Sequence, residues 1–241
     1  MLGRSHVVSG LAGASLILTL TDLSNRPEVA ATTVALVAGA AILPDIDHPG
    51  TTISRSLPPV TRVLSRVISA VSGGHRKGTH AIIGWLAFGL LAFLLASWKW
   101  TVPEFVVGPF GLPSSTVSLG LGLVAGFLAG IALTALDLDP GGVPGWVVAL
   151  VMGGIAATAH IDPIVVGALV SAGCAIHVVL GDGLTPKGVR YLYPFAKTRF
   201  RFPILGKAGS QRENLYVTFL GIVALVAPFF ERIVVPWMQT F

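Results

Sequence analysis

The sequence predicts an all-α membrane protein, a polytopic bundle of about seven hydrophobic helices arranged as three hairpins and a C-terminal helix. Two observations predict this class. Hydrophobic residues make up 53% of the 241 residues and charged residues only 11%, whereas a soluble domain needs many more surface charges. The apolar runs also have uncharged interiors, and several approach the roughly 20 residues that a helix needs to cross a bilayer.

Proline, glycine and charged residues divide the chain into these helices. The first two are short for a membrane span, so they either cross a thinned bilayer or lie partly within the protein. Frequent glycine and alanine inside the helices permit close helix packing in lipid. No separate soluble segment remains, so residues 1–241 are expected to form one membrane-embedded domain. The predicted helices cover residues 6–21, 29–44, 80–98, 117–136, 145–161, 163–180 and 215–236.

Two basic loops, at about residues 45–79 and 181–214, determine the predicted orientation in a chain whose net charge is +5. Because each hairpin returns to its starting face, His6, Asp45, His75, His80 and Asp182 should share one face with both loops. The positive-inside rule makes that face cytoplasmic. We therefore expect a multi-pass protein of a prokaryotic inner membrane, with its N-terminus in the cytoplasm and its C-terminus outside.

The segment LPDIDHPGT, at residues 43–51, places Asp45, Asp47 and His48 at the end of an apolar helix. Two carboxylates at a membrane-buried helix end are unfavourable unless a cation meets them. In an extended turn, Asp45 and Asp47 would project alike and could share one metal ion or bridge two. The alternative is structural, with Asp45 capping the helix or Asp47 forming an Asx-turn.

The segment HRKGTH separates His75 from His80 by five positions, directly before an apolar helix. The N-terminus of a helix favours negative ligands, and the turn can bring the two imidazoles together. Arg76, Lys77 and Thr79 would then suit a phosphate oxygen beside the metal. The alternative is a solvated basic loop in which the histidines are incidental.

A third group lies in HVVLGDGLTPKG, where His177 precedes Asp182 by five residues. A lone histidine on an apolar helix is more often a hydrogen-bonded core residue, which is the alternative here. The glycines beside Asp182 and the anion-binding residues that follow favour a ligand. Those predicted phosphate-binding residues are Thr185, Lys187 and Arg190.

The candidates exceed the three or four protein ligands of one zinc ion, so one to three divalent ions are expected. Cys174 is the single cysteine, which leaves nitrogen and oxygen as the donors. A mixed imidazole and carboxylate shell suits Zn, Mn or Fe, whereas a site of oxygen ligands alone would suit Mg or Ca. The candidate ligands are His6, Asp45, Asp47, His75, His80, His177 and Asp182.

Such a shell, with open positions, would lower the pKa of bound water to about 7 and polarise a phosphoryl or carbonyl oxygen. Either Asp47, as a spare carboxylate, or His48, as an unligated imidazole, would take the proton from that water. The surrounding basic residues favour an anionic substrate, and the site's position at a membrane face favours a substrate attached to a lipid. The chemistry predicted is that of a hydrolase.

At these residues the chain resembles the YdjM-type family of membrane-bound, metal-dependent hydrolases, some of which are LexA-regulated. The matching pieces run in family order from residue 6 to about residue 194: His6, LPDIDHPGT, HRKGTH, and the late H-x4-D with TPKGV and YP. The family is similar, more distantly, to zinc-dependent phospholipase C and P1-type nuclease. The resemblance implies cleavage of a phosphoester, in a phospholipid or a polyprenyl carrier.

Two alternatives belong to other functional classes. An ion or small-solute transporter would use intramembrane Asp and His as a cation pathway, and should have polar residues on both faces. An anchor would recruit anionic lipid or nucleic acid through the basic loops alone. We expect membrane lipid and an anionic lipid-like substrate as partners and no nucleic acid, and the oligomeric state is left open. The face opposite the candidate ligands offers little beyond Arg26, Glu28, Glu104 and Asp162.

Overall fold

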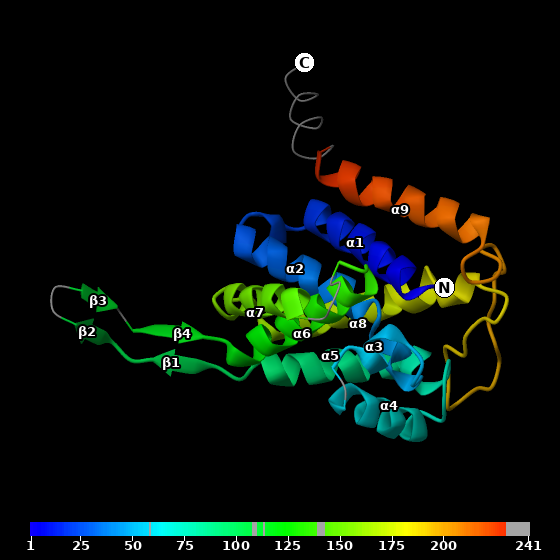
Figure 1. Cartoon of the computed structure of the whole chain (residues 1–241), viewed down its shortest axis with the longest axis horizontal. Helices are drawn as coiled ribbons and strands as arrows, with labels where there is room; N and C mark the ends of the chain where they lie inside the picture. Colours follow the sequence, from blue (N-terminus) through cyan, green and yellow to red (C-terminus); the bar gives the residue numbers. More distant parts are fainter. Residues whose placement is uncertain (58, 108–109, 113, 139–142, 230–241) are drawn as a thin grey trace, which may run out of the picture.

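The computed structural model describes residues 1–57, 59–107, 110–112, 114–138 and 143–229. In this part the chain is mostly helical, as predicted, and a helix forms at each of the predicted hydrophobic segments (Figure 1). Residues 230–236 of the last predicted helix lie outside the described residues. The helices are α1 (Gly3–Leu20), α2 (Pro27–Ala40), α5 (Ile82–Ala96), α6 (Leu119–Ala135), α7 (Val143–Ala157), α8 (Pro163–Val179) and α9 (Gln211–Phe229).

Within the described residues, four 3₁₀ turns and two further helices lie in the segments that connect these helices. The first predicted basic loop is largely structured, since it contains two of the turns and both of these helices. The turns are η1 (Asp22–Ser24), η2 (Leu43–Asp47), η3 (Gly78–His80) and η4 (Asp182–Leu184), and the helices are α3 (Thr52–Arg55) and α4 (Val60–Val71).

A β-hairpin lies between α5 and α6. Like the short helices and turns of the connecting segments, it is not predicted by the pattern of hydrophobic helices. Strand β1 (Trp100–Val102) pairs antiparallel with β4 (Ser115–Val117), and β2 (Phe105–Val107) pairs with β3 (Phe110–Leu112). The ribbon projects from one end of the helical bundle, whereas the N-terminus and the end of α8 lie toward the other end (Figure 1). The hairpin therefore takes no part in the site described below.

Helix α2 is at the centre of the packing, because it contacts α1, α6, α7 and α8. Its Leu36 and Val37 are fully buried. A helix that is apolar on all sides is expected in such a position. Around it, α6 packs mainly on α7, α5 on α8, and α1 on α9.

Glycines allow the helices to approach one another as closely as predicted. A Cβ at Gly39 of α2 would lie 2.4 Å from the carbonyl oxygen of Leu128 in α6. At the α5–α8 crossing, Gly89 and Gly167 face each other, and a Cβ on either would meet the other's carbonyl oxygen within 3 Å. Small residues at crossings are the usual means of close helix packing in lipid.

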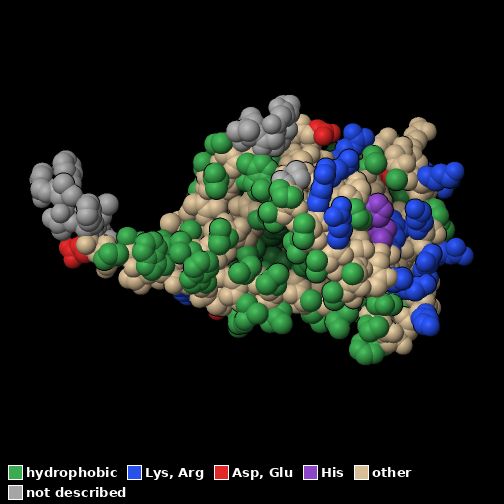
Figure 2. Space-filling model, turned by 60° about the horizontal axis from the view of Figure 1, so that its bottom comes forward, with side chains coloured by type: hydrophobic (Ala, Val, Ile, Leu, Met, Phe, Trp, Pro, Cys, Tyr) green, Lys and Arg blue, Asp and Glu red, His purple; other side chains and the backbone are tan. Residues whose placement is uncertain are grey.

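Two helical stretches, Pro27–Asp47 and Pro163–Leu184, are long and apolar enough to cross a membrane by length and composition. Helices α5, α6 and α7 are apolar but shorter, so crossing by all seven segments remains a prediction. Large hydrophobic side chains are exposed on several helices, including Leu86, Leu150 and Leu225. Hydrophobic side chains cover much of the visible face, and Lys and Arg gather toward one end (Figure 2).

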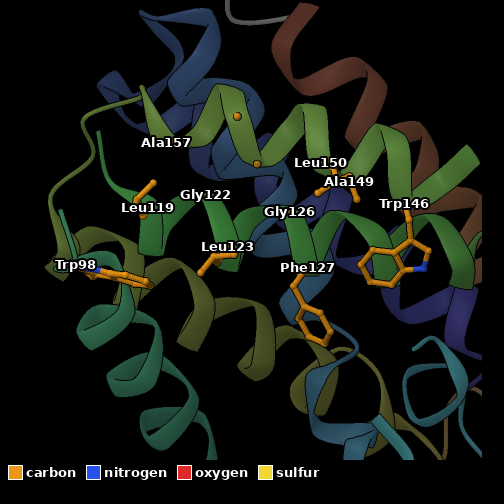
Figure 3. Close-up of a pocket in the computed structure, with 12 residues that line it drawn as sticks. Trp98, Leu119, Gly122, Leu123, Gly126, Phe127, Trp146, Ala149, Leu150 and Ala157 are labelled. Carbon is orange, nitrogen blue, oxygen red and sulfur yellow. The ribbon is translucent and has the colours of Figure 1, made fainter. Parts of the chain in front are cut away.

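An apolar groove of about 520 Å³ runs between α6 and α7. Gly122 and Gly126 form part of it, and Trp98 and Trp146 lie toward its two ends (Figure 3). Its lining is almost wholly hydrophobic, as expected of a surface that contacts acyl chains rather than water.

Glu213 joins the beginnings of α1 and α9. Its side chain is 1% exposed. One carboxylate oxygen accepts hydrogen bonds from the Leu2 amide at 2.9 Å and the Ser5 hydroxyl at 2.7 Å, and the other accepts one from the Gly209 amide at 3.0 Å. The carboxylate thus satisfies free N–H groups at two helix starts.

Replacing Glu213 with alanine should lower the free energy of unfolding by about 2–4 kcal/mol, because several buried donors would lose their acceptor. The apparent melting temperature in detergent measures this loss. Glu104→Ala removes an exposed carboxylate and should leave the melting temperature unchanged. Equal melting temperatures for the two variants would contradict the assigned role.

Candidate metal centre

The site begins where the chain leaves α2 through the 3₁₀ turn η2. Leu43 and Ile46 are buried in the core, which fixes the turn and directs Asp45 and Asp47 toward the site. The expectation that these carboxylates project alike is not met, because they belong to different groups of side chains. A 3₁₀ turn has three residues per turn, so positions two apart point in different directions.

Asp45, His80, His177 and Asp182 form the principal cluster, in which one ligand atom from each lies within 4.8 Å of every other. The Nε2 atoms of His80 and His177 are 3.3 Å apart. Asp45 Oδ1 lies 3.7 Å from each of these two nitrogens. Asp182 Oδ2 lies 3.4 Å from His80 Nε2 and 3.9 Å from His177 Nε2. Two imidazoles and two carboxylates therefore converge on one point.

A hydrogen bond at the far side of His177 orients its ring. His177 Nδ1 lies 2.8 Å from the carbonyl oxygen of Ala41. A carbonyl oxygen only accepts, so Nδ1 has the proton and the neutral ring keeps its lone pair on Nε2, which faces the cluster. Metal-binding histidines are commonly held in this way by a backbone carbonyl.

His6 and Asp182 supply the strongest indication that a cation belongs here. The His6 ring is buried and stacks on His177 with ring centroids 3.7 Å apart. Both ring nitrogens of His6, and Asp182 Oδ2, are buried without a hydrogen-bond partner. Buried polar atoms are normally satisfied, and a divalent ion would satisfy Asp182 Oδ2 and one nitrogen of His6. The donor set also fits, since imidazole and carboxylate together suit Zn, Mn or Fe.

The cluster favours positive charge at His80, which lies just before α5. Burial by itself lowers the pKa of His80, but the neighbouring carboxylates of Asp182, Asp45 and Asp47 outweigh burial and hold that pKa well above its ordinary value. A proton on the ring thus supplies positive charge to the carboxylates. A bound divalent ion would supply that charge instead.

Asp47 faces the opposite side of His80. One of its oxygens lies 2.7 Å from His75 Nδ1, and the other accepts hydrogen bonds from the Thr79 hydroxyl at 2.5 Å and the Arg76 amide at 3.2 Å. That second oxygen also lies 3.4 Å from His80 Nδ1. A neutral imidazole offers one lone pair, so His80 can bind an ion through Nε2 while Nδ1 donates to the Thr79 hydroxyl at 3.0 Å, which in turn donates to Asp47. This arrangement makes Asp47 a support for a ligand, although Asp47, His75 and His80 also form a second possible ligand group.

A polar cleft of about 610 Å³ opens beside the cluster. Arg76 crosses it, because its guanidinium donates to Asp182 Oδ1 at 2.7 Å and to the Thr185 hydroxyl at 3.0 Å. Figure 2 shows histidine at the surface among Lys and Arg at this end of the molecule. The cleft is lined by Met1, Asp45, His48, Gly50, Thr51, His75, Arg76, Asp182, Thr185, Pro186, Lys187, Gly206, Lys207 and Ala208.

These distances bring the candidate ligands together at one end of the helical bundle, whereas their predicted place on one membrane face remains a prediction. The structure also brings His48 to the cleft, where its ring centroid lies 5.0 Å from that of His75. The predicted ligands that it brings together are His6, Asp45, Asp47, His75, His80, His177 and Asp182.

Only some of the predicted phosphate-binding residues line the cleft, and others are engaged in hydrogen bonds within the protein. Lys187 and Arg76 line the cleft, whereas the Lys77 ammonium donates to the Gly73 carbonyl oxygen at 2.6 Å. The Thr79 hydroxyl is engaged by Asp47, and the Thr185 hydroxyl donates to the Asp182 carbonyl at 2.7 Å. Arg190 is absent from the described lining of the cleft.

Two contributions to the site are missing from the sequence-based prediction. Lys207 lines the cleft, but the sequence offers no signal to separate it from the other basic residues of its loop. The Ala41 carbonyl orients His177, and a backbone group has no sequence signature of its own.

Replacing Asp47 with asparagine should weaken Zn²⁺ binding by roughly 10–100-fold without abolishing it, because loss of a carboxylate behind a ligating histidine typically has that effect. Titration against a competing chelator measures the affinity. Asp137→Asn, at an exposed position, is the matched control. Unchanged affinity would show that Asp47 does not support a ligand. Complete loss of zinc from a folded variant would show that Asp47 is itself a ligand.

Comparison with known proteins identifies the family. A search of curated proteins and a search of solved structures gave no match. The family model described as YdjM inner membrane protein matches residues 1–235, which is nearly the whole chain and includes every residue of the site. The chain therefore belongs to the YdjM inner membrane protein family.

Proposed function

We propose that this protein is a metal-dependent hydrolase that cleaves a phosphoester in a membrane lipid. The observation that supports the proposal best is the position of the buried His and Asp cluster directly beside a basic cleft. The cluster suits a metal ion, and the cleft suits an anionic substrate. Membership of an inner membrane protein family supports a lipid as the substrate.

Asp45, His80, His177 and Asp182 would hold the ion, with His6 as an additional nitrogen donor. A divalent ion held by such residues polarises a phosphoryl oxygen and lowers the pKa of a bound water. The protein's own part is to keep these donors oriented and buried. It does so through the Ala41 carbonyl behind His177 and the Asp47 carboxylate behind His80.

Two histidines at the cleft are suited to different roles toward a substrate. Asp47 accepts from His75 Nδ1, so the neutral ring has its lone pair on Nε2 and can take a proton from an attacking water. His48 Nδ1 accepts from the Gly50 amide at 3.0 Å, so its neutral ring has the N–H on Nε2 and can donate a hydrogen bond to a substrate oxygen. This assignment modifies the sequence-based proposal, in which Asp47 or His48 accepted the proton.

Positive side chains would bind the phosphate. Arg76, Lys187 and Lys207 all line the cleft. Arg76 is the best placed, because its guanidinium already links Asp182 to Thr185 and a planar guanidinium can bind two phosphate oxygens at once. A phospholipid or a polyprenyl phosphate carrier has the required anionic group on an apolar chain.

A transporter would use the same acids and histidines as a cation pathway. We rank it second because the candidate ligands gather at one end of the bundle. Because an unpaired charge in lipid is energetically costly, a cation pathway would need further polar groups along its length. Glu28 and Asp162 lie at the N-terminal ends of α2 and α8, whereas the candidate ligands lie at or beyond the C-terminal ends of these two helices.

His75→Gln should lower kcat by about 10²–10⁴-fold while metal content stays at the wild-type level, because the change removes a proton acceptor and no principal ligand. The assay is phosphate or headgroup release from an anionic phospholipid and from a polyprenyl diphosphate, with protein in lipid nanodiscs. His160→Asn, at an exposed position on another part of the chain, should keep full activity.

Two results would contradict the proposal. Wild-type activity in His75→Gln would show that His75 does not accept the proton. Absence of hydrolysis by metal-loaded wild type, together with a cation flux in proteoliposomes that stops in Asp45→Ala, would assign the site to transport.

A further inference from the structure

Helix α4 has an unusual distribution of side chains. Thr61 and Ser65, which are small and polar, are its buried residues. Val63 and Val67 are exposed by 56% and 54%. In a water-soluble protein the apolar side would face the core, so the apolar stripe of α4 must meet something other than water. The exposed apolar residues of the stripe are Val60, Val63, Leu64, Val67 and Val71.

The contacts of α4 fix this orientation. The Thr61 hydroxyl donates to the Ser54 carbonyl at 3.0 Å and accepts from the Leu57 amide at 3.1 Å. These bonds attach the polar side of the helix to the preceding segment. These hydrogen bonds therefore hold α4 with its apolar stripe facing away from the rest of the protein.

The apolar stripe continues onto the exposed side of α5. An apolar groove of about 570 Å³ lies between the two helices, with Val67 and Val71 on one wall and Ile83 and Leu91 on the other. Ile83 and Leu91 are themselves exposed. In Figure 1, α4 lies beside α5 at the periphery of the bundle. The exposed apolar residues of α4 and α5 therefore form one continuous apolar surface.

A row of positive charge lies on a different side of α4 from the apolar stripe. Arg62 and Arg66 are four positions apart, so they share one face of the helix, and both are exposed. No Asp or Glu occurs between His48 and Pro103, so no nearby acid in the sequence neutralises them. An amphipathic helix with a basic polar side and an apolar side is typical of helices that lie in the membrane interface.

We propose that α4 is an interfacial helix that binds anionic phospholipid, with its valine stripe among the acyl chains and with Arg62 and Arg66 at the headgroup phosphates. This inference depends on the membrane location and is independent of the proposed hydrolysis. Arginine near an anionic leaflet is stabilised by about 1 kcal/mol, and apolar burial adds to it. The helix ends four residues before His75, so the lipid surface would also fix one border of the metal site.

The test places a fluorescent NBD group at position 67 of the full-length protein in nanodiscs. Cys174→Ala removes the single native thiol, and Val67→Cys receives the label. The nanodiscs contain phosphatidylcholine alone or with phosphatidylglycerol, and nitroxides on the lipid quench from the headgroup region or from the chain end. We expect quenching mainly from the headgroup region, and more of it with phosphatidylglycerol.

Charge removal then tests the role of the arginines. Arg62→Gln with Arg66→Gln should reduce the docked population in phosphatidylglycerol by roughly fivefold for each arginine lost, and high salt should have the same effect on the unmodified helix. The matched control is Arg199→Gln with Arg201→Gln, which removes two exposed charges from the other basic loop and should leave quenching unchanged.

Three results would overturn the proposal. An NBD group that remains in water in both nanodiscs would show that α4 does not enter the interface. A group that is shielded from water yet is not quenched by lipid nitroxides would assign the stripe to a protein contact. Equal quenching in both lipids, unaffected by the arginine substitutions, would exclude recognition of anionic headgroups.

Discussion

The site depends on one electrostatic constraint, which is that Asp47 and Asp182 are buried, and Asp45 is only 14% exposed, at the end of an apolar bundle. Removing an ionised carboxylate from water costs several kcal/mol even after the protein relaxes. Asp47 is compensated by hydrogen bonds from His75, Thr79 and the Arg76 amide. Asp182 is compensated in part through Oδ1, which lies 2.7 Å from the Arg76 guanidinium and 3.3 Å from the Met1 ammonium. Its Oδ2 and the Asp45 carboxylate face the imidazoles of the cluster. Further positive charge at this point would complete the compensation, and a divalent ion is the species that the donors fit.

Close helix packing is what brings the donors to that point. Gly173 of α8 lies against the Val37 carbonyl and Ala40 of α2 with no room for a Cβ. This approach places His177 within hydrogen-bond distance of the Ala41 carbonyl. Gly181 has the same role at the end of α8, since a Cβ there would overlap the His6 ring. Glycines that permit packing in lipid thus also set the dimensions of the candidate metal centre.

The hydrophobic helices and the proximity of the ligands could be predicted from sequence, because long apolar runs mark the helices and the candidate ligands all lie at or near the ends of these runs. Other features depend on information that a linear pattern lacks. The separation of Asp45 from Asp47 follows from a five-residue 3₁₀ turn, which apolar periodicity does not specify. The strands of the β-hairpin have three residues each, too few to show a period of two. Helix α4 is concealed within a basic segment, since its arginines suggest a solvated loop. The roles of Ala41 and Lys207 arise only from three-dimensional contact.

The metal content of the detergent-purified protein, resolved by element, tests the central claim most directly. Wild type should be compared with Asp45→Ala, His80→Ala and His177→Ala, with His160→Asn as the control for loss of an unrelated histidine. The account predicts at least one stoichiometric Zn, Mn or Fe ion in wild type and control, and its loss from all three cluster variants. Stoichiometric metal in the cluster variants, or none in wild type after controlled reconstitution, would contradict it.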